Sequence, residues 1–126
     1  MSRAVLDASA ALAYLLGEPG AAVVTSVLLD AAIGAINASE VITKLMERVS
    51  PGTARADFQQ LGLDVIPFDL RLAMLTADLR APTRSAGLSL GDRACLALGR
   101  QMRLPVYTAD RRWATVDVGV EVRLIR

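Results

Sequence analysis

The 126-residue sequence contains no histidine, and this absence excludes several kinds of active site. Serine and cysteine triads with an imidazole base, zinc sites built on histidine and paired-histidine ribonuclease mechanisms all require that side chain. The single cysteine, Cys95, cannot form an intrachain disulfide, and its position in the helical pattern RACLALG is typical of a small core residue. If the protein is an enzyme, carboxylates must carry out its chemistry.

The sequence also lacks long uncharged runs and a strong net charge. Hydrophobic residues make up 53% of it, but charges interrupt every apolar run before the ~18 residues that a membrane span needs. The start MSRAVLDAS has no signal-peptide hydrophobic region or cleavage site, so we expect a soluble, cytoplasmic protein without a membrane partner. The net charge of +1 provides no global basic field for nucleic acid, although it does not exclude such a partner.

Short apolar runs bounded by polar or turn residues are typical of buried strands. We predict strands over 4–6, 31–36, 65–67, 105–107 and 120–125. The last of these alternates apolar and charged residues, which predicts a half-exposed edge strand.

Helical periodicity occupies the segments between these runs. We predict helices over 9–16, 20–29 and 54–61, and around three apolar stripes: Val41, Ile42, Leu45, Met46 and Val49; Leu72, Leu75 and Leu79; Cys95, Leu98 and Met102. Gly17 is expected to end the first helix, and Pro51-Gly52 the third. The alternation predicts one α/β domain over residues 1–126, with a central, mainly parallel sheet flanked by helices.

Four acidic residues lie at or just beyond the ends of apolar runs. Asp7 follows AVL, Glu40 follows IGAINAS, Asp92 follows LSLG and Asp110 follows PVYTA. In a parallel α/β fold, such residues gather at the carboxyl edge of the sheet. An all-oxygen cluster suits Mg²⁺ or Mn²⁺ better than zinc, and these metals indicate phosphate chemistry with a metal-activated water.

Helix capping offers a second explanation for each acid, because Asp and Glu are favoured near helix N-termini. Asn37 and Glu40 have capping-box spacing, and Ser89 with Asp92 is a close variant. Four caps at one edge would, however, repel one another without a counterion. The clustering therefore favours a cation site, while capping remains open for each acid singly.

Two hydroxyl residues accompany the other two acids. Ser9 competes with Asp7 as the first helix cap and is also a candidate to orient a carboxylate or a metal-bound water. Thr108 is a candidate to support Asp110, which could itself cap the segment DRRWAT.

Cationic and aromatic residues near the acids are further candidates. Arg93, Arg111 and Arg112 could contact a phosphate group, although exposed arginines are commonly just solvated. Trp113 could stack on a base, but a single tryptophan in an amphipathic segment is more typical of a core anchor.

The segments VLDASAALAYLL, NASEV and SLGDRACLALGRQMRLPVYTADRRW, followed by a terminal strand, resemble PIN-domain ribonucleases, and VapC-type toxins most closely. The resemblance spans essentially the whole chain and is most specific from Leu88 to Trp113. It implies a PIN-like three-layer fold, cleavage of RNA with Mg²⁺ or Mn²⁺, homodimerisation and inhibition by a VapB-type antitoxin.

The same resemblance implies roles for individual residues. Asp7 and Asp92 are the principal metal-coordinating carboxylates, and Glu40 and Asp110 complete the site directly or through water. Thr108, in the family's T-x-D pattern, is a supporting polar residue.

Other functions remain open from the residues alone. A haloacid-dehalogenase-type phosphatase also begins with an aspartate after its first strand, but its D-x-D motif would require an acid where Ser9 stands. A receiver domain would need a late lysine, whereas the only lysine is Lys44. A non-enzymatic α/β interaction module would explain each acid as a cap.

Overall fold

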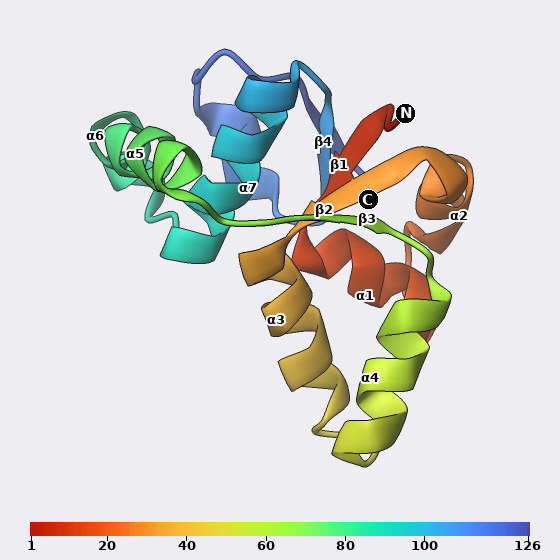
Figure 1. The fold of residues 1–126 in the computed structure, drawn as a ribbon. Helices are drawn as coiled ribbons and strands as arrows, with labels where there is room; N and C mark the ends of the chain where they lie inside the picture. Colours follow the sequence, from red (N-terminus) through yellow and green to blue (C-terminus); the bar gives the residue numbers. More distant parts are fainter.

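A five-stranded parallel sheet forms the centre of the computed structural model, which describes all residues from 1 to 126 (Figure 1). The strands are β1 (Ala4–Leu6), β2 (Ala31–Gly34), β3 (Asp64–Ile66), β4 (Val106–Thr108) and β5 (Val122–Leu124). Their spatial order is β3-β2-β1-β4-β5, and every neighbouring pair is parallel. The predicted α/β fold with a parallel sheet is confirmed.

The connections reverse direction at β1. From β1 the chain proceeds outward to β2 and β3 on one side, and later returns to place β4 and β5 on the other side. Open α/β sheets bind ligands at such a switch point, beyond the carboxyl ends of the two strands that flank it. Here those strands are β1 and β4.

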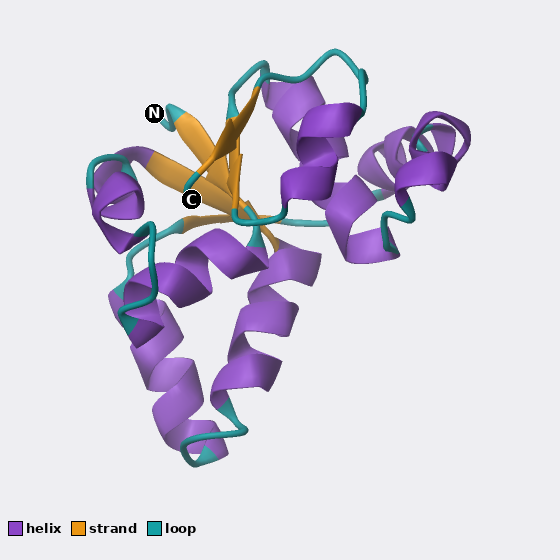
Figure 2. Ribbon diagram, turned by 180° about the vertical axis from the view of Figure 1, so that it is seen from behind, coloured by secondary structure: helices purple, strands orange, loops and turns teal.

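Helices cover both faces of the sheet (Figure 2). They are α1 (Ala8–Leu16), α2 (Ala21–Thr25), α3 (Ala35–Leu45), α4 (Pro51–Gln60), α5 (Leu70–Asp78), α6 (Arg80–Thr83) and α7 (Leu90–Met102), with 3-10 helices η1 (Leu28–Asp30), η2 (Arg84–Ala86) and η3 (Arg111–Thr115). α7 packs on one face with α5 against it, while α1 and α3 pack on the other face with α2 and α4 outside them. None of these helices is both long and apolar enough to cross a membrane.

The alternation of side chains along β1 divides the core between the two faces. Val5 contacts the cluster formed by α7, whereas Ala4 and Leu6 contact the cluster formed by α1. Trp113 and Cys95 are completely buried in the α7 cluster. The prediction that both are core residues is confirmed, and Trp113 therefore presents no ring for base stacking.

Two element boundaries differ from the predictions, the first of them because one apolar run continues from a strand into a helix. The strand predicted over 31–36 ends at Gly34, and α3 begins at Ala35. Pro51 does not end the third helix; it occupies the first turn of α4, where its missing N–H needs no partner, and Ser50 caps that helix.

Other boundaries agree more closely. Gly17 ends α1 in the left-handed conformation, with φ 66°, as predicted. The helix predicted over 20–29 is divided into α2 and η1. The predicted edge strand is β5, with its middle residue exposed between two half-buried neighbours.

Candidate functional site

Asp7 leaves the end of β1 and is almost completely buried, with 5% of its surface exposed. It is the N-cap of α1, because its Oδ1 accepts the Ala10 backbone N–H at 2.8 Å. The Ser9 hydroxyl donates to the same oxygen at 2.7 Å, and the Thr108 hydroxyl donates to Oδ2 at 2.6 Å. The cap is therefore Asp7 rather than Ser9, and both hydroxyls contact its carboxylate.

Burial raises the pKa of Asp7 from its ordinary 3.8 to about 6. Hydrogen bonds from Thr108, Ser9 and Ala10 oppose the rise, and the negative charge of Asp92 adds to it. The carboxylate is still ionised at neutral pH, but its charge is held at a cost in stability.

The two hydroxyls also tie the end of β1 to the end of β4. The Thr108 Oγ1 accepts the Asp110 backbone N–H at 3.0 Å, and the Ser9 Oγ accepts the Ala109 N–H at 2.9 Å. Residues about 100 positions apart in the sequence therefore share one hydrogen-bond network at the switch point.

Glu40 lies inside α3 and reaches toward the start of α7. A Cβ placed on Gly91 would lie 2.6 Å from the Glu40 Oε2, so only glycine leaves room for this carboxylate. Partial burial raises the pKa of Glu40, the Asn37 hydrogen bond lowers it, and the charge of Asp92 raises it further.

Asn37 holds Glu40 from within the same helix. Its Nδ2 donates to the Glu40 Oε1 at 2.9 Å and to the Gly91 carbonyl at 3.1 Å, and only 2% of the residue is exposed. The two acceptors fix the orientation of the amide, because a swapped amide would place its oxygen against them. The expected Asn37–Glu40 capping box is wrong, since α3 begins at Ala35 and both residues are interior to it.

Asp92 lies in the first turn of α7 and does form the expected capping box. The Ser89 Oγ accepts the Asp92 N–H at 3.2 Å, and the Asp92 Oδ2 accepts the Ser89 N–H at 2.9 Å. Its negative charge raises the pKa of both Asp7 and Glu40. Capping and participation in the acidic group are thus compatible at this residue.

Asp110 caps η3, as expected for the segment DRRWAT. Its Oδ1 accepts the Arg112 backbone N–H at 3.0 Å, and the Arg112 guanidinium Nη2 donates to Oδ2 at 2.6 Å. These contacts with Arg112 lower the pKa of Asp110. The same Nη2 lies 3.6 Å from the Asp92 Oδ2, so Arg112 links two of the four acids.

The other two candidate arginines form no ion pair with the acids. The Arg93 Nη1 donates to the Thr76 carbonyl of α5 at 3.1 Å, which directs this side chain between helices. Arg111 is exposed and forms no side-chain hydrogen bond or ion pair.

A family model of the PIN domain matches residues 4–119. The chain belongs to the PIN domain family. The resemblance inferred from the sequence is therefore confirmed, and the match leaves the phosphatase and receiver alternatives without support.

Solved structures share this PIN fold. A DNA-bound VapBC complex from Salmonella typhimurium contains a chain with a TM-score of 0.80 and 18% identity, and the alignment covers 100% of both chains. A DNA-bound VapBC2 complex from Rickettsia felis gives a TM-score of 0.77 and 11% identity, and the alignment covers 96% of this chain and 97% of the other. A VapBC complex from Mycobacterium tuberculosis gives a TM-score of 0.64 and 21% identity, and the alignment covers 100% of this chain and 99% of the other. No curated protein matches the sequence.

The acidic edge of this PIN domain, the part of the sheet edge that carries Asp7, Glu40, Asp92 and Asp110, has the donor chemistry of a hard divalent cation site. Its donors are carboxylates; the only thiol, Cys95, is fully buried, and burial raises its pKa well above the ordinary value. No three acidic or thiol groups converge closely enough to share one ion as they stand. The repulsion that Asp7 and Glu40 each experience from Asp92 is nevertheless what a cation would relieve.

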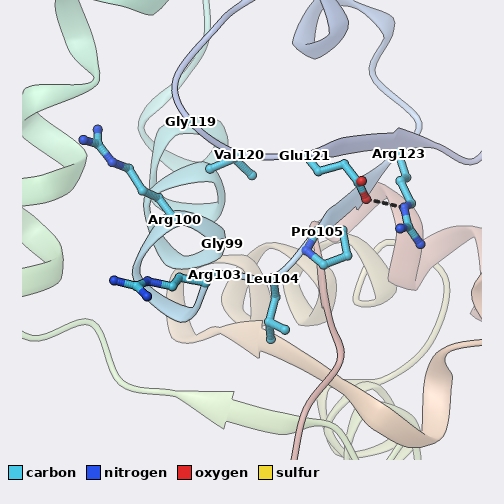
Figure 3. A pocket seen from close by; sticks show the side chains of 9 residues that line it. All are labelled: Gly99, Arg100, Arg103, Leu104, Pro105, Gly119, Val120, Glu121 and Arg123. Atoms are coloured by element: carbon cyan, nitrogen blue, oxygen red, sulfur yellow. Dashed lines mark hydrogen bonds and ion pairs between the residues drawn. The ribbon is translucent and has the colours of Figure 1, made fainter.

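The larger of two surface pockets lies at the opposite edge of the sheet, where β4 and β5 begin (Figure 3). Its volume is about 400 Å³, and its lining includes Arg100, Arg103 and Arg123. Arg123 pairs with Glu121 and donates to the Tyr107 hydroxyl at 2.8 Å, while Arg100 and Arg103 point away from it (Figure 3). Because these cations diverge, the pocket offers no convergent anion site.

Two residues of the acidic edge were not identified as such from the sequence. The sequence indicates Asn37 only as a cap, because its buried contact with the start of α7 depends on tertiary packing. Gly91 did leave a signal, because a glycine in the first turn of a helix weakens that helix and indicates close approach of another group.

Proposed function

We propose that this PIN domain is a metal-dependent endoribonuclease of the VapC type, the toxin of a VapBC-type pair. It would hydrolyse RNA phosphodiester bonds with Mg²⁺, or Mn²⁺, held by carboxylates. The observation that carries the proposal is the buried Asp7, with a pKa of about 6, held by hydroxyl and backbone donors at the switch point near Asp92. Perturbed carboxylates of this kind are characteristic of functional sites.

The hydrogen bonds to Asp7 indicate which of its atoms would bind the cation. A carboxylate has about four acceptor positions, two on each oxygen. Oδ1 already accepts from Ser9 and Ala10, whereas Oδ2 accepts only from Thr108 and retains one free position. Ser9 and Thr108 would thus hold the carboxylate with Oδ2 available.

The remaining acids have graded roles in the proposal. Asp92 would be the second principal ligand, and Glu40 and Asp110 would act directly or through water. Asn37 and Gly91 would hold the Glu40 carboxylate beside the start of α7. When bound, a divalent cation supplies Lewis acidity that neutralises the phosphodiester and stabilises charge on the leaving oxygen.

Arg111 is proposed as a contact for RNA phosphates. It follows Asp110 in the chain, and its exposed side chain has no hydrogen-bond or ion-pair partner. Arg93 and Arg112 are weaker candidates for this role, since both donate to groups of the protein itself.

We further propose a homodimer that acts in the cytoplasm and is inhibited by a VapB-type antitoxin. The antitoxin is supported by the structural neighbours, several of which were solved as VapBC complexes, whereas the homodimer and the location rest on the sequence resemblance alone. An antitoxin arginine reaching into the acidic edge would be a physically reasonable inhibitor. Substitution of the acids should then weaken the pair, and unchanged affinity across all four substitutions would argue against this mode of inhibition.

Cleavage of a panel of structured RNAs tests the activity. With Mg²⁺ or Mn²⁺ we expect cleavage that a chelator abolishes and that Asp92→Asn reduces by about 100-fold or more, the scale of losing a group that organises transition-state charge. Asn at this position can still accept the Ser89 N–H, so the capping box should persist. Asp117→Asn, an exposed acid without a side-chain partner, is the matched control and should cleave normally.

Two outcomes would contradict the metal mechanism: cleavage that survives the chelator, or an Asp92→Asn variant as active as wild type. Calorimetry with Mn²⁺ tests the non-enzymatic alternative. Equal heats for wild type and Asp7→Asn would favour a module whose acids serve only as caps.

A further inference from the structure

The Arg112 side chain makes contacts that neutralise part of the acidic edge from within the protein. Its Nε donates to both oxygens of Asp110, at 3.0 and 3.1 Å, and its Nη2 donates to the Asp110 Oδ2 at 2.6 Å. The same Nη2 is 3.6 Å from the Asp92 Oδ2. A single guanidinium therefore interacts with two of the four carboxylates that we assign to the cation.

Two backbone carbonyls hold the Arg112 guanidinium only weakly. Its Nη1 donates to the carbonyls of Ala86 and Gly87 at 3.4 and 3.3 Å, which are long for hydrogen bonds. The Arg112 side chain is 53% exposed, whereas those of Asp92 and Asp110 are only 21% and 25% exposed. The arginine head group therefore has access to solvent, whereas the two carboxylates are held at the edge by the helix caps that they form.

We propose that Arg112 is an internal counterion that competes with a divalent cation for the carboxylates of Asp92 and Asp110. The inference rests on the proposed metal-dependent function. Both the guanidinium and a divalent cation bind carboxylate oxygens, but the metal carries twice the charge in a smaller volume. Cation binding would therefore displace Arg112 from both acids, and the competing Arg112 side chain would lower the apparent affinity of the protein for the metal.

Arg111 provides a matched control for this competition. It is the preceding residue in the same 3-10 helix, carries the same charge and has no ion pair with the acids. Removing Arg111 changes the long-range field near the site, whereas removing Arg112 also frees the two carboxylates. The difference between the two variants isolates the direct contacts.

The experiment is Mn²⁺ titration by calorimetry at physiological ionic strength. We expect Arg112→Ala to bind Mn²⁺ about fivefold more tightly than wild type, the upper range for losing a competing exposed ion pair. Arg111→Ala should change the affinity by less than about twofold, because salt screens exposed charges. Arg112→Lys should be intermediate, since it keeps the charge but loses the bidentate geometry.

The outcomes separate this inference from the proposed function. If Arg112→Ala binds Mn²⁺ no more tightly than wild type while Asp92→Asn loses binding, the competition is wrong and the metal site stands. If Arg111→Ala gains as much as Arg112→Ala, the effect is a general charge effect and the competition is again wrong. If neither wild type nor Arg112→Ala binds Mn²⁺, both proposals fail.

A second measurement does not depend on any variant folding. The Nε–H of Arg112, observed by NMR in the wild-type protein, should lose its hydrogen-bonded shift when Mg²⁺ is added. A signal that remains unchanged at saturating Mg²⁺ would show that the ion does not displace the arginine, and would overturn the inference.

Discussion

Replacing Asp7 by Asn should make the protein more stable at neutral pH, even though it removes the residue most central to the proposed activity. The reason is the burial of a charge: the Asp7 carboxylate is 5% exposed, and its pKa is about 6 against an ordinary value of 3.8. Asn is as good an N-cap as Asp, so the hydrogen bond from the Ala10 N–H can persist. The Asn Nδ2 could in turn donate to the Thr108 hydroxyl, which can rotate to accept.

The magnitude follows from the difference between the two pKa values, which corresponds to about 3 kcal/mol when the group is ionised in both states. The folded protein keeps its Asp7 proton up to about pH 6, whereas the unfolded chain gives it up near pH 3.8. The unfolded state therefore binds fewer protons in this window, and the wild-type free energy of unfolding falls as pH rises through it. The loss is complete above about pH 6, and Asn avoids it.

Urea unfolding of wild type and Asp7→Asn between pH 3.5 and 8, with chelator present, measures this difference. Near pH 3.5 the two should be equally stable, and at pH 7.5 the variant should be more stable by about 1 to 3 kcal/mol, or up to roughly 10 °C in Tm. Excess Mn²⁺ should narrow the gap by stabilising only wild type.

Asp7→Ala serves as the control, because it removes both the charge and the cap. Its gain in the free energy of unfolding over wild type at pH 7.5 should be about 1 kcal/mol smaller than that of Asp7→Asn. The reasoning about buried charge is refuted if Asp7→Asn is no more stable than wild type at pH 7.5. It is equally refuted if the difference does not change between pH 3.5 and 7.5.

Two further variants test how the site is held. Thr108→Val removes the donor to the Asp7 Oδ2 and the acceptor of the Asp110 N–H, so it should cost about 1 to 3 kcal/mol in urea unfolding and raise the pKa of Asp7 further. The exposed Thr25→Val should lower the free energy of unfolding far less. An equal loss in both variants would show that the buried hydrogen-bond network around Asp7 contributes nothing to stability. Gly91→Ala should displace the Glu40 carboxylate toward solvent and reduce RNA cleavage by roughly 10- to 100-fold, with stability within about 1 kcal/mol of wild type because Ala favours the helix. Gly52→Ala, where an added Cβ meets nothing within 4 Å, should leave cleavage unchanged, and full activity of Gly91→Ala would contradict the role of that close contact.

Local patterns predicted the elements better than their ends. The apolar triplet Ala4–Leu6 is a strand bounded by Asp7, and the Ser89–Asp92 capping box begins α7 as expected. The run from Ala31 was harder, because Ala and Ile suit a buried strand and a helix equally well, and the change from β2 to α3 falls inside it. The Asn37–Glu40 pair shows the same ambiguity, because its spacing fits a cap although the helix already begins at Ala35.

The positions of the four acids were readable from the sequence, whereas their interactions were not. Strand ends in a parallel sheet share one edge, so Asp7 and Asp110 could be placed near each other from their positions alone. The link from Arg112 to both Asp110 and Asp92 could not, because it depends on where η3 packs against the start of α7. Nor could the contact of Glu40 with Gly91, which joins helices more than 50 residues apart.

The sequence by itself determined the chemistry open to this protein. Without histidine and with one buried thiol, only carboxylates at the ends of apolar runs remained to hold a cation, and hydrophobic periodicity was enough to predict the parallel α/β fold. The tertiary structure decided the state of those carboxylates. Burial raises the pKa of Asp7, and Arg112 lowers that of Asp110, because pKa depends on neighbouring charges, donors and exclusion of water, and only packing brings these together.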